Sequence, residues 1–117
     1  MGVEEILKKM EEMIGEEPEP QVLFSKLVPE WIARQADERK FVMSLPNIPE
    51  KYKHLIMIAV AAALESEMCT EMFVKIAKRS GVSDREIGEA ILVARFAKAS
   101  TIFATATPAF RWLVGER

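Results

Sequence analysis

The amino-acid sequence predicts an all-α fold, arranged as a compact bundle of about six helices within a single domain of 117 residues. Two observations lead to this class. Apolar residues recur at helical spacing in most segments, and residues that start or stop helices separate these segments. In addition, no segment alternates apolar and polar residues for long, so the sequence gives no sign of a β-sheet.

Residues 3–44 contain two predicted helices, and a proline-rich connector and a short apolar segment lie between them. The first covers residues 3–14, ends at Gly15, and has a regular apolar face made of Val3, Ile6, Leu7, Met10, Met13 and Ile14. After the connector "EEPEP", Val22 to Leu27 is apolar enough for one or two buried turns. Pro29 suits the start of the next helix, which runs to residue 44 with an apolar seam through Trp31, Ile32 and Val42.

The central helix is predicted to begin at Pro49 and to run to about Ser66. Its middle, "LIMIAVAAAL", is apolar on every side, which predicts that it is buried at the centre of the fold. The three alanines allow close approach of a neighbouring helix, from the same chain or from another subunit. This longest apolar run has ten residues, too few to span a bilayer, so we expect no membrane partner.

The C-terminal half is predicted to hold three helices. The first carries Cys69 and ends before Gly81, which suits a left-handed C-cap. The next begins at the capping box "SDRE", residues 83–86, and buries Ile87, Ala90, Ile91, Ala94 and Ala97. Ser100 is predicted to cap a last helix, which Pro108 kinks or restarts.

Composition excludes several classes of function. Sixteen basic and eighteen acidic residues are interspersed without a basic patch, so nucleic acid is not an expected partner. One cysteine and one histidine exclude an intramolecular disulfide and leave no set of metal ligands, and no glycine-rich phosphate loop is present. We therefore expect no metal and no cofactor. No signal-peptide pattern opens the chain, so the cytoplasm is the expected compartment.

Cys69 and His54 are the residues best suited to chemistry. Cys69 lies in the first turn of its predicted helix, where the helix dipole favours a thiolate, but Glu65, Glu67 and Glu71 surround it and disfavour one. From these residues alone, an inert buried cysteine is the favoured interpretation. His54 lies one turn into the central helix and could exchange protons near neutral pH, although such a histidine is most often at the surface or half-buried.

Two stretches resemble the carboxymuconolactone decarboxylase and alkylhydroperoxidase D-like family in the order and spacing of their residues. They are "IPEKYKHLIMIAVAAALESEMC" and "AKRSGVSDREIGEAILVARFAKAS", and the similarity runs from Ile48 to about Leu113. It implies one domain of that family over residues 1–117. It also implies assembly through helix faces into a homo-oligomer, commonly a trimer or hexamer, and a peroxiredoxin-type antioxidant oxidoreductase activity.

The redox branch of this family has two cysteines separated by two residues, a histidine four residues after the second, and a glutamate twelve residues before the first. In this chain the second cysteine matches Cys69, while the first matches Ser66, which cannot form a disulfide. The histidine position holds Phe73, and the glutamate position holds His54. The resemblance thus implies catalytic positions at Cys69, His54 and Ser66, in a single-cysteine form of the site.

Three functions remain open at this point. The first is thiol-dependent peroxide reduction, with Cys69 as attacking thiol, His54 as base or proton donor, Ser66 as hydrogen-bond partner of the sulfur, and an external thiol as reductant. The second is a non-catalytic oligomeric module that binds a small apolar organic ligand in a pocket made drier by Phe73. The third is lactone or decarboxylation chemistry with His54 as general acid or base. The residues alone favour the second, whereas the resemblance implies the first.

Overall fold

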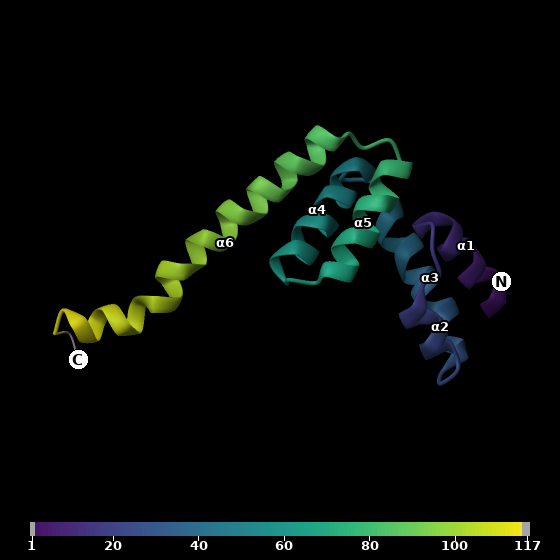
Figure 1. Cartoon of the computed structure of the whole chain (residues 1–117), viewed down its shortest axis with the longest axis horizontal. Helices are drawn as coiled ribbons and strands as arrows, with labels where there is room; N and C mark the ends of the chain where they lie inside the picture. Colours follow the sequence, from purple (N-terminus) through teal and green to yellow (C-terminus); the bar gives the residue numbers. More distant parts are fainter. Residues whose placement is uncertain (1, 116–117) are drawn as a thin grey trace.

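A computed structural model describes residues 2–115, and in that range it contains six helices and no strand (Figure 1). This confirms the all-α class and the number of helices. The helices are α1 (Val3–Ile14), α2 (Glu19–Ser25), α3 (Pro29–Ser44), α4 (Glu50–Ala63), α5 (Glu67–Arg79) and α6 (Asp84–Leu113).

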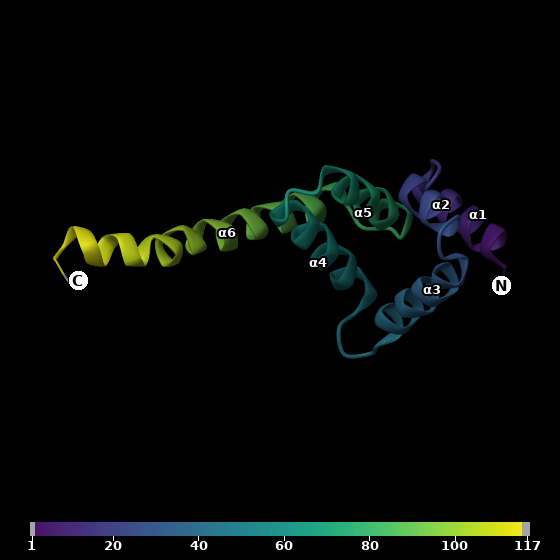
Figure 2. The same cartoon turned by 90° about the horizontal axis from the view of Figure 1, so that it is seen from below.

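The first three helices lie together at one end of the molecule (Figures 1 and 2). As predicted, α1 ends at Gly15, whose φ of 87° is left-handed and therefore favours glycine. Arg79 of α5 donates hydrogen bonds to the backbone carbonyls of Glu12 and Met13, and thereby holds the C-terminus of α1 against α5. The unpaired carbonyls of the last turn of α1 thus gain a cationic partner from another helix.

The segment predicted as one or two buried turns forms α2, but the prediction of burial was wrong. No residue of α2 is buried, and the side chains of Leu23, Phe24 and Leu27 are exposed. The seam predicted for α3 is likewise covered only in part, because Ile32 is buried while Trp31 is exposed. These short helices pack on one another and on α1, and one chain supplies no further layer to cover their outer apolar faces.

The core lies where α4 and α5 form an antiparallel hairpin and the first half of α6 packs across it. Ile58, Ala77 and Val82 form its buried centre, surrounded by the partly buried side chains of Leu55, Phe73, Val74, Ile87 and Ile91. Gly81 (φ 92°) ends α5, and Ser83 and Glu86 form the predicted capping box at the start of α6. A salt bridge of 2.8 Å between Lys51 and Glu86 joins the first turns of α4 and α6.

Only one side of α4 is buried, which corrects the prediction of a helix covered on every side. The buried side carries His54, Ile58 and Ala61. The opposite side, called here the α4 stripe, exposes residues four apart: Tyr52, Ile56, Val60 and Leu64. The sequence pattern correctly indicated an apolar helix, but it could not indicate which side the chain itself covers.

Residues 84–113 form one continuous helix, so the prediction of a separate last helix capped by Ser100 was wrong. The Ser100 hydroxyl donates to the Phe96 carbonyl at 3.2 Å, as an interior helical serine does. No glycine or proline follows Gly88 before Pro108, so nothing in the sequence interrupts the helix there. Pro108 lies inside the helix and cannot donate to a carbonyl one turn earlier, and Figure 1 shows α6 changing direction near its C-terminal end.

A single chain is more open than the predicted compact bundle. Its radius of gyration is 18.6 Å, whereas a compact domain of this length has a radius of gyration of about 13 Å. Figures 1 and 2 show the cause, since α6 runs away from the other helices over its second half. No helix within residues 2–115 is both long and apolar enough to cross a membrane.

Candidate functional site

Cys69 lies in the first turn of α5, directly after the tight connection from α4. Its side chain is partly buried, and its sulfur forms no disulfide. The backbone N–H of Cys69 donates to the Ser66 hydroxyl at 3.3 Å, and Thr70 donates its hydroxyl to the Ser66 carbonyl at 2.7 Å. Ser66 is therefore the N-cap of α5, and this cap fixes the position of Cys69 at the positive end of a 13-residue helix.

The connection between α4 and α5 is a Schellman motif. The N–H of Glu65 donates to Ala62, and that of Ser66 donates to Ala61, each at 3.0 Å. Glu65 occupies the left-handed position, with φ 61°, where glycine is usual. It is the only non-glycine residue with positive φ among those described, and it lies four residues before Cys69. Backbone strain of this kind is concentrated at functional sites.

The acidic residues around Cys69 are partly compensated by two lysines, one from α6 and one from α5 itself. Lys98 of α6 donates to the Ala63 carbonyl at 2.9 Å and lies 3.7 Å from the Glu65 carboxylate. Glu71 pairs with Lys75 at 3.1 Å. The hydrogen bonds that Lys75 donates to Glu71, and then to Glu16, raise the pKa of Lys75 above its usual value. The sequence alone did not identify Lys98, because 33 residues separate it from Glu65 in the chain.

His54 is almost fully buried in α4, with 2% of its surface exposed. Its Nε2 lies 3.4 Å from the Glu50 carboxylate, one turn earlier on the same helix. Its Nδ1 is buried and has no hydrogen-bond partner within the described residues. If the Glu50 carboxylate accepts a hydrogen bond from Nε2–H, Nδ1 carries the lone pair and can act as a base.

Arg39 of α3 extends this arrangement to a second helix. Burial lowers the pKa of Arg39, and the negative charge of Glu50 acts in the opposite direction. The Glu50 carboxylate is thus influenced by a cation from α3 as well as by the imidazole. The i, i+4 spacing of Glu50 and His54 was visible in the sequence, but the approach of Arg39 required the fold.

Cys69 and His54 lie on facing helices of one hairpin but at different levels. The hydrogen bond from the Ser66 N–H to the Ala61 carbonyl places Ser66 and Ala61 at the same level of the hairpin. At a rise of about 1.5 Å per residue, His54 then lies about 6 Å further along the hairpin axis than Cys69. Within residues 2–115 no hydrogen bond joins them. Phe73 packs against the Ile58, Ala77 and Val82 core rather than beside a polar group.

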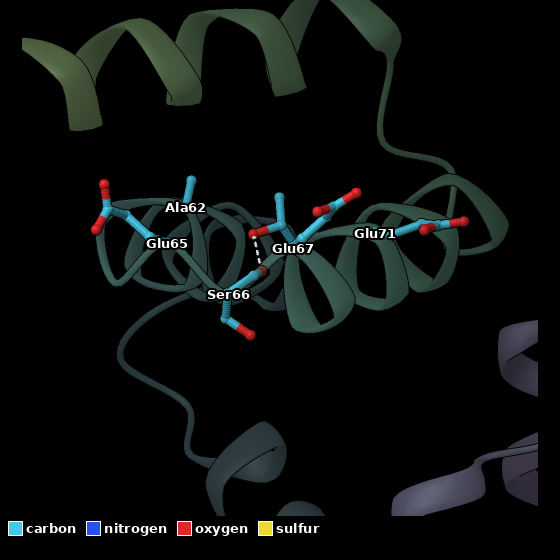
Figure 3. Close-up of a pocket in the computed structure, with 6 residues that line it drawn as sticks. Ala62, Glu65, Ser66, Glu67 and Glu71 are labelled. Carbon is cyan, nitrogen blue, oxygen red and sulfur yellow. Dashed lines mark hydrogen bonds between the residues drawn. The ribbon is translucent and has the colours of Figure 1, made fainter.

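A shallow depression of about 400 Å³ lies at the connection between α4 and α5. Its lining is Ala62, Glu65, Ser66, Glu67, Thr70 and Glu71, so it includes the cap of α5 but neither Cys69 nor His54. Figure 3 shows the carboxylates of Glu65, Glu67 and Glu71 pointing apart rather than towards one point. In the described part of the chain, no three acidic, histidine or cysteine side chains are grouped as a metal site would require.

Comparison with known proteins assigns the chain to a family. The sequence model of the carboxymuconolactone decarboxylase family matches residues 29–112, which is most of the chain. The chain belongs to the carboxymuconolactone decarboxylase family. The match starts at Pro29, so the family likeness extends further towards the N-terminus than the similarity noted from Ile48.

A solved structure supports this family assignment through its fold. The crystal structure of a protein from Methanobacterium thermoautotrophicum is 30% identical in sequence and superposes with a TM-score of 0.68. The alignment covers 75% of this chain and 99% of that protein. No curated protein matches the chain. Membership of the carboxymuconolactone decarboxylase family is therefore established, whereas the reaction has to be argued from the site.

Proposed function

We propose that this member of the carboxymuconolactone decarboxylase family reduces peroxides with Cys69 as the single reacting thiol and an external thiol as reductant. The observation that carries the proposal is the placement of Cys69. It is partly exposed in the first turn of α5, where the helix dipole favours a thiolate and the Ser66 hydroxyl lies next to it. The Ser66 oxygen accepts from the Cys69 N–H, so its own proton remains available to donate to the sulfur.

The proposed reaction has two stages. The Cys69 thiolate attacks the outer oxygen of the peroxide, the O–O bond breaks, and the alkoxide leaves and takes a proton, which gives an alcohol and a sulfenic acid. An external thiol then condenses with the sulfenic acid, which releases water and forms a mixed disulfide. A second external thiol attacks that disulfide and returns Cys69 to its reduced form. His54, oriented by Glu50, would exchange the protons that these steps require.

Peroxide consumption by the purified protein tests this proposal. With dithiothreitol as reductant and tert-butyl hydroperoxide as substrate, we expect turnover by the native protein and only the uncatalysed rate for Cys69→Ser. Met68→Leu, a change of the exposed neighbouring side chain, is the matched control and should retain the native rate. A dimedone adduct on Cys69 after exposure to peroxide would identify the sulfenic acid. A native rate equal to that of Cys69→Ser would contradict the proposal.

A second candidate function has its own observation. The buried His54 has Glu50 on one nitrogen and, among residues 2–115, no partner on the other, which is the arrangement of a general acid or base. It would serve lactone or decarboxylation chemistry of the kind after which the family is named. In this case a carboxymuconolactone should be turned over, His54→Gln should abolish turnover, and Cys69→Ser should not. Loss of peroxide reduction in Cys69→Ser with no lactone turnover would decide for the thiol reaction. Failure of both reactions would leave a non-catalytic ligand-binding module.

A further inference from the structure

His54 is used in both proposed reactions, yet the chain encloses it almost completely. Its side chain is 2% exposed, and its Nδ1 has no hydrogen-bond partner among residues 2–115. An imidazole exchanges protons with a substrate only within hydrogen-bond reach. One of the segments that enclose His54 must therefore move before the imidazole meets a substrate.

The neighbouring residues of α4 show which helices enclose His54. Lys51 binds Glu86 of α6, whereas Lys53 donates hydrogen bonds to backbone carbonyls of α3. At about 100° per residue around the helix, His54 points between these two lysines. It points in nearly the same direction as Ile58, which packs with Ala77 of α5 in the core. We infer that α5 covers the front of His54, while α6 and the end of α3 cover its two flanks.

The flank covered by α3 is the least firmly packed of the three. We call residues 39–49 the strap; they comprise the C-terminal part of α3 and the connection to α4. No residue of the strap is buried, and only Arg39 and Met43 are partly buried. The connection contains Pro46 and Pro49, which have no N–H, and residues 45–49 donate no hydrogen bond to another backbone group. Figure 2 shows α3 and α4 running apart from this connection. Segments with so few buried contacts are the ones that open first.

Lys53 is the side chain that holds the strap on α4. Its ammonium donates to the carbonyls of Val42 at 2.9 Å and Met43 at 3.1 Å, and also to that of Leu45. All three N–H groups of the ammonium are thus used on the end of α3. The carbonyls there carry the negative end of the helix dipole, so a cation stabilises them.

Arg39 acts in the opposite direction and disfavours the closed strap. It lies on the same side of α3 as the buried Ile32, and its guanidinium forms no hydrogen bond with the described residues. Burial lowers the pKa of Arg39, and the attraction to Glu50 offsets part of this effect. The closed strap therefore keeps a cation partly out of water without giving it an acceptor, which costs free energy.

We propose that the strap opens and closes over the flank of His54, that Lys53 holds it closed, and that the open form admits a substrate to the imidazole. Opening breaks the three hydrogen bonds of Lys53 and returns the guanidinium of Arg39 to water. It leaves the core of α4, α5 and α6 intact, because the strap contributes no residue to that core. The role in substrate entry rests on the proposed chemistry at His54, whereas the opening itself does not.

Chemical modification of the imidazole measures the opening directly, because His54 is the only histidine of the chain. Diethyl pyrocarbonate should modify native His54 more slowly than it modifies free N-acetylhistidine. Lys53→Met should raise the rate about tenfold, the change that loss of one hydrogen bond to a charged group produces in an equilibrium. Arg39→Met should lower the rate below that of native protein. Lys40→Met, at an exposed position within the strap, is the control and should keep the native rate.

The opposite signs of the two variants separate the strap from a general loss of stability, which would raise the rate in both. Equal rates for native protein and Lys53→Met would overturn the proposal, as would a faster rate in Arg39→Met. A native rate equal to that of N-acetylhistidine would overturn it as well, because the strap would then cover nothing.

Amide hydrogen exchange covers the case in which Lys53→Met does not fold. In native protein, residues 39–44 should exchange at least about tenfold faster than residues 70–79 of α5, and equal protection of the two segments would refute the strap. Where Lys53→Met folds, it should speed exchange in residues 39–44 and leave residues 70–79 unchanged. Equal acceleration of both segments would assign the exposure of His54 to global unfolding and would refute the proposal.

Steady-state kinetics separates this proposal from the proposed function. If native protein turns over a carboxymuconolactone, KM should fall in Lys53→Met and rise in Arg39→Met while kcat changes little, because the apparent affinity follows the open fraction. An unchanged KM in a variant whose His54 has become accessible would refute the role of the strap in substrate entry. If native protein has no turnover, the modification and exchange experiments still decide whether the strap opens.

Discussion

The strained backbone of Glu65 predicts a stabilising substitution next to the candidate site. Glu65 has φ 61° at the left-handed position of the Schellman motif. A residue with a side chain pays about 1–2 kcal/mol for that conformation, whereas glycine adopts it without strain. Part of this stabilisation is offset, because an unfolded chain with glycine at this position has more conformational entropy to lose on folding. We therefore expect Glu65→Gly to increase the free energy of unfolding by about 1 kcal/mol.

The loss of the Glu65 carboxylate in this variant changes the expected free energy of unfolding little. Glu65 lies 3.7 Å from Lys98, and both side chains are half or more exposed. An exposed pair of this kind contributes about 0–1 kcal/mol. Glu65 also follows the negative end of α4 and precedes the positive end of α5, so the two helix dipoles act on its charge in opposite directions. The backbone effect should therefore dominate.

Thermal and urea unfolding at a fixed chain concentration measure the effect, since association would make stability depend on concentration. Glu65→Ala is the matched control, because it removes the same charge and keeps the left-handed strain. A gain of about 1 kcal/mol raises the melting temperature by about 4–8 °C in a domain of this size. If Glu65→Gly is no more stable than Glu65→Ala, the argument from backbone strain is refuted.

Two further predictions concern other parts of the fold. A hydrogen bond from Lys51, followed by two from Ser83, lowers the pKa of Glu86 to about 2, so its stabilising effect is complete above the unfolded value of about 4.3 and is lost as the pH falls towards 2. The native protein should melt at a higher temperature than Glu86→Gln, and this difference should shrink over that pH range. Glu89→Gln, which removes an exposed i, i+4 pair with Arg85, serves as the control. A difference between native protein and Glu86→Gln that does not depend on pH would contradict the prediction. Gly15→Ala should destabilise the protein by about 1–2 kcal/mol, because its φ is 87° and a Cβ would overlap the Arg79 guanidinium. Gly88→Ala, inside α6 with open space around it, should stabilise the protein by about 1 kcal/mol. Urea unfolding measures both variants, and free-energy changes of the same sign for Gly15→Ala and Gly88→Ala would refute this prediction.

Helix boundaries were predictable where a residue type has a specific role at a helix end. Gly15 and Gly81 have left-handed φ, and Ser83 with Glu86 forms both hydrogen bonds of a capping box. The boundary at Ser100 was wrong because serine is tolerated inside a helix when its hydroxyl donates to an earlier carbonyl, and no helix breaker accompanied it. A capping residue alone is thus a weak signal, whereas a capping residue together with its partner is a strong one.

Burial was less predictable, because an apolar pattern does not state what covers it. The run from Leu55 to Leu64 is apolar on all sides, yet the chain covers only the side with Ile58 and Ala61. The same holds for α2, and for α6, where burial was predicted for five residues and none is buried: Ile87, Ala90, Ile91, Ala94 and Ala97. In each case the pattern predicted a covered surface, and the fold of one chain does not provide the cover.

Of the candidate site, only the residues that a motif or a short spacing in the sequence relates to one another could be predicted. The family resemblance led to Cys69, Ser66 and His54, and the spacing of Glu50 and His54 was visible as an i, i+4 pair. Lys98 and Arg39 approach the site from other helices, and no local pattern relates them to it. Contacts of that kind depend on the packing angles of the helices, which the sequence does not state.

Ser66 stands where the redox branch of the family has its first cysteine, and the structure gives this difference a physical consequence. Ser66 caps α5, and serine is among the best N-cap residues, so Ser66→Cys should cost about 1 kcal/mol of stability. The change should also create two thiols at the N-cap and third positions of α5, three residues apart. We expect them to form a disulfide that dithiothreitol reduces, as mass spectrometry after thiol labelling would show. Ser66→Ala loses the same cap without gaining a thiol, and therefore separates stability from redox behaviour. If Ser66→Cys stays a dithiol under mild oxidation, the connection between α4 and α5 does not hold the two positions close enough for a disulfide, and the parallel with the two-cysteine members fails.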